Sequence, residues 1–197
     1  MQPLRKEPSE ISKLKFIIRF ARFVQSASNS PMRLMLRVLR LRHGNGCFFH
    51  RSVKWSLATL DRIHIGSLVG IHRDCCVFIP NHAKSGSITI GDGVSIGDGS
   101  RLYAEGPMWI GDGCLISTNV FISDSSHNLE PHHRFVSRSG MSFRKAVFVG
   151  ENCFIGRNSI LLPGVRLGNN CTVGANCIVR GYFPDGSTIV SPLAEKL

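Results

Sequence analysis

The sequence contains no long apolar segment and no C-x-x-C pair, and each absence argues against a class of protein. Arg19 and Arg22 interrupt the stretch 16–24, which is too short and too charged for a transmembrane helix, and no signal-peptide cleavage site follows it. Without C-x-x-C, a zinc ribbon or a thioredoxin-like site is not expected. The seven cysteines cannot all pair within the chain. They favour a reducing, cytoplasmic compartment.

Acidic residues are few, and this scarcity gives the chain its high net charge. Thirteen Asp and Glu stand against 24 Lys and Arg, a formal net charge of +11, which suggests nucleic-acid binding at first sight. Residues 1–46 hold ten of the basic residues and two of the acids, so +8 belongs to this segment and only +3 to the rest. No nucleic-acid motif accompanies the charge. We therefore do not expect a nucleic-acid partner.

An apolar anchor recurs every six residues over most of the chain, and glycine follows many of the anchors. Six residues is neither the helical period of about 3.6 nor simple alternation, and a helix would not tolerate so many glycines. A short strand and a turn in every six residues fit both features. The anchors are Ile65, Ile71, Val77, Ile90, Ile96, Leu102, Ile110, Ile116, Ile122, Val149, Ile155, Leu161, Leu167, Val173 and Val179.

Three such units form one triangular coil, and stacked coils bury a continuous core. The sequence therefore predicts a mainly β fold, a left-handed parallel β-helix solenoid of hexapeptide repeats over residues 47–192, with a C-terminal tail over 193–197. The fourth residue after most anchors is small or β-branched, and five of the seven cysteines fill that position. This placement indicates small buried hydrophobes instead of metal ligands or nucleophiles.

The spacing between equivalent anchors locates one long external loop. Ile110 and Val149 lie 39 residues apart, about 21 more than one coil needs, so a loop over about 123–146 leaves the solenoid and returns. Smaller insertions of about seven and two residues precede Ile90 and Ile110. Long loops on a rigid repeat are where function tends to lie.

Three histidines, His127, His132 and His133, lie in this loop. A histidine titrates near neutrality and can take a proton from an alcohol and return it in a later step. Asp124 precedes His127 by three residues, close enough to orient the imidazole if the loop curls back. Two alternatives stay open from the residues alone. One is a solvated loop with incidental histidines, and the other is a zinc site, although adjacent histidines rarely point at one metal.

Residues 63–192 resemble the hexapeptide-repeat acyltransferase family, and within it the acetyl-CoA-dependent sugar O-acetyltransferases. The most specific stretch, residues 149–180, reads VGENCFIGRNSILLPGVRLGNNCTVGANCIVR, similar to the family's repeated I-G-x-N units and P-G-V turn. The resemblance implies a homotrimer with active sites between subunits, acetyl-CoA as donor and no metal. It further implies transfer to a saccharide hydroxyl in lipopolysaccharide, capsule or exopolysaccharide biosynthesis, with His127 as general base.

The resemblance also assigns contacts with coenzyme A and with the acceptor. By position, Arg157 and Ala175 match coenzyme A contacts. The family has a lysine near the nucleotide phosphates, at the position of Gly181 here. Arg180, one residue before that position, supplies the positive charge. Glu105 matches an acidic acceptor contact. Gly97 stands where the galactoside enzymes have an asparagine that binds the sugar, so we expect an acceptor other than a simple galactoside.

Three other functions share most of these features. An amino-sugar N-acetyltransferase would differ only in its acceptor. A catalytically silent β-helix could serve as a binding or scaffold subunit, and it would not bind acetyl-CoA. A hydratase resembling the gamma carbonic anhydrases would hold zinc. Each alternative is separated from the O-acetyltransferase by one assay: an acceptor panel, calorimetry with acetyl-CoA, or elemental analysis.

The basic N-terminal segment, residues 1–46, is predicted to be helical, with runs over 11–24 and 32–41 separated by a Ser- and Pro-containing turn. Arginines three to five residues apart in the second run leave a basic face against an apolar one. This pattern is typical of an interfacial helix, so residues 11–42 are candidates for peripheral contact with anionic lipid at the inner face of the membrane. The alternative is that these helices cap the end of the solenoid or pack on a neighbouring subunit.

Overall fold

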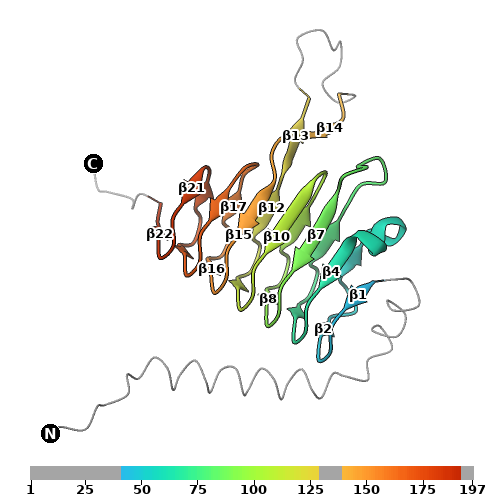
Figure 1. Ribbon diagram of the computed structural model, residues 1–197, viewed down its shortest axis with the longest axis horizontal. Helices are drawn as coiled ribbons and strands as arrows, with labels where there is room; N and C mark the ends of the chain where they lie inside the picture. The colour runs from blue at the N-terminus through green and yellow to red at the C-terminus, as the bar shows by residue number, and fades with distance from the viewer. Residues whose placement is uncertain (1–40, 129–138, 192–197) are drawn as a thin grey trace, which may run out of the picture.

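The computed structural model describes residues 41–128 and 139–191, which form the predicted parallel β-helix. Three parallel sheets, here called A, B and C, run along the axis of the stacked coils (Figure 1). Sheets A and B each have seven strands and sheet C has six. The predicted helical runs up to residue 40 and the tail over 193–197 lie outside the described residues. Within the described ranges, no helix is long and apolar enough to cross a bilayer.

The strands are short, and each coil contributes one strand to each sheet, except that the last described coil has none in sheet C. Sheet A contains β1 (Arg42–His43), β4 (Ile63–Ile65), β7 (Ser87–Ile90), β10 (Pro107–Ile110), β15 (Val147–Val149), β18 (Arg166–Leu167) and β21 (Tyr182–Phe183). Sheet B contains β2 (Phe48–Phe49), β5 (Gly70–Ile71), β8 (Ser95–Ile96), β11 (Leu115–Ile116), β16 (Phe154–Ile155), β19 (Thr172–Val173) and β22 (Thr188–Ile189). Sheet C contains β3 (Lys54–Trp55), β6 (Cys76–Phe78), β9 (Arg101–Tyr103), β12 (Phe121–Ser123), β17 (Ile160–Leu161) and β20 (Ile178–Val179).

The register of the sheets confirms the period read from the sequence. In sheet A, Ile65, Ile90, Ile110, Val149 and Leu167 are successive register partners, and these are the residues that the spacing identified as equivalent. Every predicted anchor is at most 5% exposed. The anchors therefore form the continuous core between the sheets.

One further coil precedes those that the sequence revealed. Its anchors pair with the first predicted ones: His43 with Ile65, Phe49 with Ile71, and Trp55 with Val77. The period was hidden because an imidazole and two aromatic rings replace the branched aliphatic side chains. The Phe49 ring packs edge to face on both neighbours, with centroids 5.5 Å from His43 and 5.3 Å from Trp55. Within the described residues, the first strand of the β-helix is thus β1 at Arg42–His43, inside the segment predicted to be helical up to residue 46.

The five cysteines that the repeat placed at this position are buried, and their thiols donate to carbonyl oxygens. Cys47, which follows the hidden anchor His43 by four residues, is a sixth member of the set. Ser100 and Ser159 occupy the same position in other coils and donate to corner carbonyls at 2.8 Å. Thiols donate to equivalent carbonyls at 3.0–3.2 Å: Cys47 to Gly66, Cys75 to Gly97, Cys114 to Gly150, Cys153 to Gly168, and Cys171 to Pro184.

Because a hydroxyl already serves in this position, we expect Cys171→Ser to change the free energy of unfolding by less than about 1 kcal/mol. Cys171→Leu adds methylenes to a closed corner and should destabilise the protein by about 1–3 kcal/mol. Urea unfolding followed by circular dichroism measures both. A serine variant as unstable as the leucine variant would contradict the assignment of the thiol as a small, hydrogen-bonded filler.

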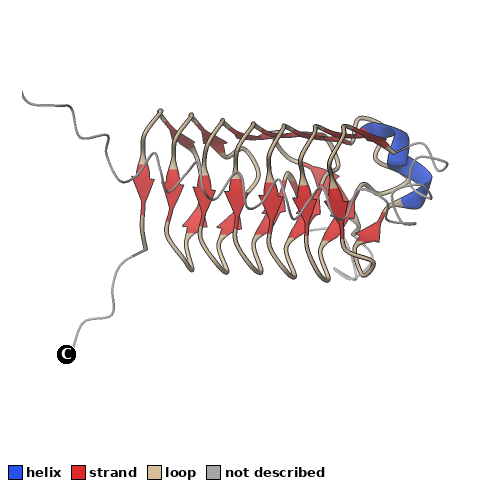
Figure 2. Ribbon diagram, turned by 90° about the horizontal axis from the view of Figure 1, so that it is seen from below, coloured by secondary structure: helices blue, strands red, loops and turns tan. Residues whose placement is uncertain are grey.

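Every insertion between successive coils leaves the β-helix at one corner, where the chain passes from sheet C to sheet A. Four consecutive coils carry one there: the 3₁₀ helix η1 (Leu57–Arg62), then residues 79–86, 104–106 and 124–146. The last contains an antiparallel hairpin, β13 (Ser125–His127) with β14 (Met141–Phe143), which stands out from the coils in Figure 1, while η1 lies at one end of the stack in Figure 2. We call this edge the insertion corner.

Candidate functional site

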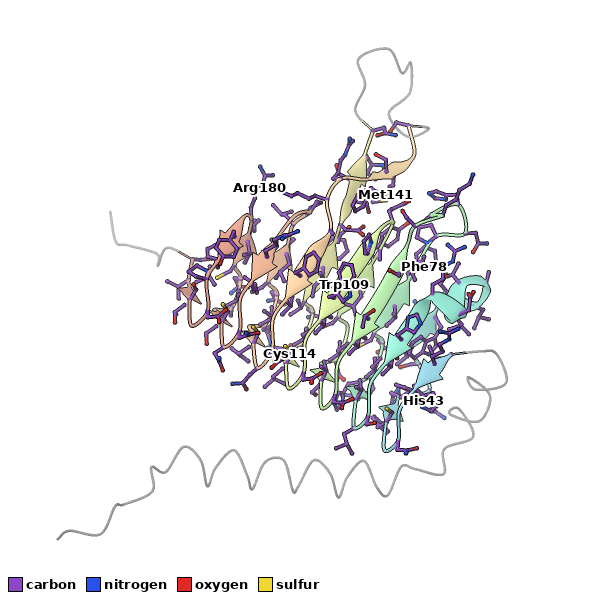
Figure 3. The ribbon with its side chains drawn as sticks, viewed as in Figure 1. His43, Phe78, Trp109, Cys114, Met141 and Arg180 are labelled. Atoms are coloured by element: carbon purple, nitrogen blue, oxygen red, sulfur yellow. The ribbon has the colours of Figure 1, made fainter. Side chains whose placement is uncertain are left out.

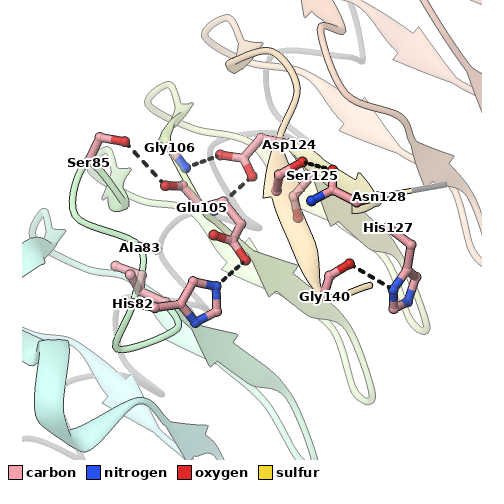
Figure 4. A network of polar contacts seen from close by, with 12 residues as sticks. His82, Ala83, Ser85, Glu105, Gly106, Asp124, Ser125, His127, Asn128 and Gly140 are labelled. Atoms are coloured by element: carbon pink, nitrogen blue, oxygen red, sulfur yellow. Dashed lines mark hydrogen bonds and ion pairs between the residues drawn. The ribbon is translucent and has the colours of Figure 1, made fainter. Parts of the chain in front are cut away.

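The insertion corner stacks polar side chains from three successive coils (Figure 4). His82 comes from the insertion between β6 and β7, Glu105 from the short turn between β9 and β10, and Asp124 and His127 from the loop after β12. The sequence separates His82 from His127 by 45 residues. The coils bring their loops to one edge because each insertion lies at the same point of its coil.

Asp124 joins the long loop to the turn beneath it. Its side chain is fully buried, and its two carboxylate oxygens accept the backbone N–H groups of Glu105 and Gly106, each at 2.8 Å. Its own carbonyl accepts the N–H groups of Arg144 and Lys145. The structure therefore does not bring Asp124 to the His127 imidazole, as the spacing of three residues had suggested. Asp124 instead holds both ends of the hairpin against the coil.

Burial raises the pKa of Asp124 above its ordinary value of 3.8, although the N–H groups of Glu105 and Gly106 pull it down. The folded protein thus holds this proton more tightly than the unfolded chain. The contribution of Asp124 to stability is therefore largest at low pH, and it falls as the pH rises from the ordinary pKa through the pKa of the folded state.

We expect Asp124→Asn to destabilise the protein by about 1–3 kcal/mol, because the amide keeps one acceptor oxygen and turns an N–H donor toward a buried N–H. Urea unfolding at neutral pH measures the change. Asp185→Asn is the matched control, since Asp185 is exposed and accepts one backbone N–H, from Asn169. Equal losses in the two variants would contradict the role given to Asp124.

The hairpin also packs back onto the coil through an aromatic ring. The ring of Phe143 in β14 packs directly against Gly106. A Cβ atom at position 106 would clash with this ring. Any larger residue at position 106 would push the ring away. The position of the hairpin, and with it the position of His127, thus depends on this glycine and on Asp124.

His127 lies on the exposed face of the hairpin with one ring nitrogen held. Its Nδ1 is 3.3 Å from the carbonyl oxygen of Gly140. A carbonyl oxygen only accepts, so Nδ1 carries the hydrogen and Nε2 of the neutral ring has the free lone pair. Arg144 donates to the His127 carbonyl at 2.9 Å and to the Asn128 side chain at 3.1 Å. In this arrangement Nε2 is the ring nitrogen with the lone pair that a general base uses.

Glu105 and His82 form a second polar pair at this corner. The Glu105 side chain is only 5% exposed, and its Oε1 lies 3.1 Å from Nε2 of His82, whose side chain is 67% exposed. Sequence reasoning identified Glu105 and missed His82. The only signal for His82 was the insertion of about seven residues before Ile90, which places that loop at the same corner.

The residues matched to coenzyme A contacts lie at two different corners. Arg157 and Ala175 are exposed in adjacent coils between sheets B and C, where the N–H of Asn176 donates to the Arg157 carbonyl. Arg180 is exposed at the insertion corner, on the same edge as Met141 of the hairpin (Figure 3). The structure brings Arg157 and Ala175 together and leaves Arg180 apart from them.

A second cation lies near Arg180, and no sequence pattern pointed to it. The aliphatic part of the Lys145 side chain packs on Gly164, and a Cβ atom at position 164 would lie 2.7 Å from Cδ of Lys145. The Gly164 N–H donates to the Lys145 carbonyl at 3.0 Å. Lys145, Gly164 and Arg180 follow one another up the insertion corner in consecutive coils. The corner therefore offers two exposed positive charges beyond the hairpin.

His132 and His133, which raised the alternative of a zinc site, lie outside the described residues. In the ranges 41–128 and 139–191, no group of three or more His, Cys, Asp or Glu is arranged to hold a metal ion.

Comparisons with known proteins agree with the repeat and the fold. Residues 146–180 match the family model described as the hexapeptide repeat of succinyl-transferase. The chain is 29% identical over 117 residues to a galactoside O-acetyltransferase of Lactococcus lactis, covering 58% of this chain and 55% of that protein. It is 32% identical over 124 residues to a putative lipopolysaccharide biosynthesis O-acetyl transferase, WbbJ, of Escherichia coli, covering 57% and 60%. The chain thus spans less than two thirds of either relative.

Among solved structures, the fold resembles AntD, an N-acyltransferase from Bacillus cereus, in complex with dTDP and 3-hydroxybutyryl-CoA. The TM-score is 0.66 at 20% identity, covering 83% of this chain and 85% of that one. At this identity the likeness concerns the fold alone. The six-residue repeat and its register in three parallel sheets agree with the match of residues 146–180 to the hexapeptide-repeat model.

Proposed function

We propose that the chain is an acetyl-CoA-dependent O-acetyltransferase that acetylates a saccharide hydroxyl in lipopolysaccharide, capsule or exopolysaccharide biosynthesis. The observation that carries the proposal is the exposed His127 imidazole, whose Nδ1 is held by the Gly140 carbonyl and whose Nε2 keeps its lone pair. The two relatives named above, whose names state O-acetyl transfer to a galactoside and in lipopolysaccharide biosynthesis, support the substrate class.

In the proposed reaction the acetyl group passes directly from donor to acceptor. Nε2 of His127 takes the proton of a saccharide hydroxyl, and the oxygen attacks the carbonyl carbon of the thioester. The carbon–sulfur bond then breaks, and His127 returns the proton to the departing thiolate. No enzyme nucleophile is needed, which fits repeat-position cysteines such as Cys114 and Cys153, which are buried and donate to carbonyl oxygens.

The donor carries phosphates, and exposed cations at the corners suit them. Lys145 and Arg180 lie along the insertion corner, whereas Arg157 and Ala175 lie at the corner between sheets B and C. One extended coenzyme A molecule would contact both pairs of residues where the insertion corner of one protomer lies against the corner between sheets B and C of its neighbour. We therefore propose a homotrimer in which the insertion corner of one protomer faces the other corner of its neighbour.

The proposal extends to the cellular setting of the enzyme. A cytoplasmic protein with residues 11–42 in peripheral contact with anionic lipid would work beside the membrane on which saccharide precursors are assembled. The arginine spacing of that segment supports the idea, and vesicle sedimentation of the full chain against a chain lacking residues 1–40 would test it.

The direct test of the activity combines donor binding with an acceptor panel. Calorimetry measures acetyl-CoA binding, and thiol release is followed with p-nitrophenyl glycosides of glucose, galactose, mannose, rhamnose, N-acetylglucosamine and a 4-amino-4-deoxy sugar. An ester product, cleaved by mild alkali, supports the proposal. An alkali-stable amide formed only with the amino sugar indicates an N-acyltransferase, and absence of acetyl-CoA binding indicates a scaffold subunit.

A further inference from the structure

We propose that His82, held by Glu105, is the side chain that selects and orients the saccharide acceptor. The inference rests on the proposed function and deepens it, because it moves the acceptor contact from Glu105 to a histidine that the repeat pattern did not identify. Glu105 then becomes a positioning residue that acts through the His82 imidazole.

Glu105 is poorly placed to meet an acceptor itself. Its side chain is 5% exposed, its Oε1 lies 3.1 Å from His82, and its backbone N–H is held by the buried Asp124. The His82 side chain, by contrast, is 67% exposed. A saccharide that approaches this part of the corner would therefore touch the imidazole before it could reach the carboxylate.

The pairing with Glu105 fixes the chemistry that His82 presents. A buried carboxylate needs a hydrogen-bond donor, so the hydrogen lies on Nε2 of His82. In the neutral ring, Nδ1 of this largely exposed side chain then has a lone pair that can accept a hydrogen bond. Such an atom binds a hydroxyl O–H and discriminates against a sugar that lacks this hydroxyl.

The loop that carries His82 is anchored on both sides, so the imidazole has a defined position. Arg62 of η1 donates to the Ala83 carbonyl at 2.6 Å, and the Ala83 side chain is 4% exposed. Ser85 donates to the Glu105 carbonyl at 3.4 Å. Two elements, one from the coil before and one from the coil after, thus hold the loop at the corner that also carries His127 (Figure 4).

The two histidines are therefore given different tasks. His127 is held by a carbonyl on the projecting hairpin, whereas His82 is held by a carboxylate close to the coils. With His127 removing the proton of the reacting hydroxyl, His82 would accept a hydrogen bond from another hydroxyl of the same sugar. The acceptor class is thus a saccharide with at least two free hydroxyls, one acetylated and one recognised.

The experiment is steady-state kinetics on the full chain with the glycoside that the panel identifies. We expect His82→Ala to raise the acceptor KM about tenfold while kcat and the KM for acetyl-CoA stay within twofold, which corresponds to loss of one hydrogen bond. Glu105→Gln, which keeps an acceptor oxygen, should raise the acceptor KM less. His64→Ala is the matched control, because His64 lies on sheet A beside Arg42 and should change neither constant.

Deoxy analogues of the same glycoside distinguish recognition from a structural effect. For one deoxy sugar, the KM of the wild type should be raised as much as His82→Ala raises the KM for the parent sugar. With His82→Ala, the same deoxy sugar should raise the KM no further. An unchanged acceptor KM for His82→Ala, with or without a fall in kcat, would overturn the assignment.

If the wild type binds a glycoside in calorimetry but never acetylates it, the proposed function fails, and weaker binding by His82→Ala still supports His82. A wild type that neither binds nor acetylates any glycoside contradicts both.

Discussion

Replacing His127 with alanine is expected to reduce kcat by about 10²–10⁴-fold, the range typical of a lost general base. The tautomer held by the Gly140 carbonyl leaves Nε2 as the proton acceptor, and no other imidazole lies on the described part of the hairpin. Acetyl-CoA affinity should stay unchanged, because the cations suited to its phosphates lie elsewhere on the corner. Thiol release and calorimetry measure the two quantities.

Two further variants sharpen this test. His127→Gln keeps a polar side chain of similar reach but has no titratable nitrogen, so it should lose as much activity as the alanine variant. His64→Ala removes an imidazole from the outer face of sheet A and should leave kcat unchanged. Equal kcat values for the wild type and His127→Ala would show that His127 is not the general base.

Truncating one central anchor is expected to give the largest loss of stability. Ile116 lies in β11 between Ile96 and Ile155 of the neighbouring coils, and its side chain is fully buried. Ile116→Ala should destabilise the protein by about 2–5 kcal/mol, because the lost contacts leave a cavity between rigid coils. The repeat spreads this loss to adjacent coils, since each coil is stabilised mainly by its neighbours.

The preceding residue of the same strand is a matched control. Leu115 points outward from β11 and is 37% exposed, so Leu115→Ala should lower the free energy of unfolding by less than about 1 kcal/mol. Urea midpoints followed by circular dichroism compare the two variants. A Leu115 variant as unstable as the Ile116 variant would show that the anchors do not carry the core.

The sequence was sufficient to predict the coils because the period depends on local chemistry alone. An aliphatic anchor every six residues lets stacked coils bury all anchors in one core, and Ile65, Ile90 and Ile110 pair as their spacing predicted. The first coil escaped detection because His43, Phe49 and Trp55 are not aliphatic. Phe49 is buried and packs edge to face on the half-buried rings of His43 and Trp55, which a hydrophobic pattern does not reveal.

The site was less predictable because its contacts cross between coils. His127 could be found from the length of its loop, but its Gly140 partner lies 13 residues away on the opposite strand. The three-residue spacing suggested Asp124 as the orienting group, yet backbone N–H groups of the preceding coil occupy that carboxylate. His82 meets Glu105 across 23 residues, and only the stacking of two insertions brings them together.

The most direct measurement of the central claim is the transfer of isotopically labelled acetyl from acetyl-CoA to a saccharide, with the product identified by mass spectrometry and mild alkali. We predict one labelled acetyl group per acceptor, released by alkali as an ester, and near-complete loss of this product with His127→Ala. Tight acetyl-CoA binding with no labelled saccharide, or a labelled product formed equally by His127→Ala, would contradict this claim.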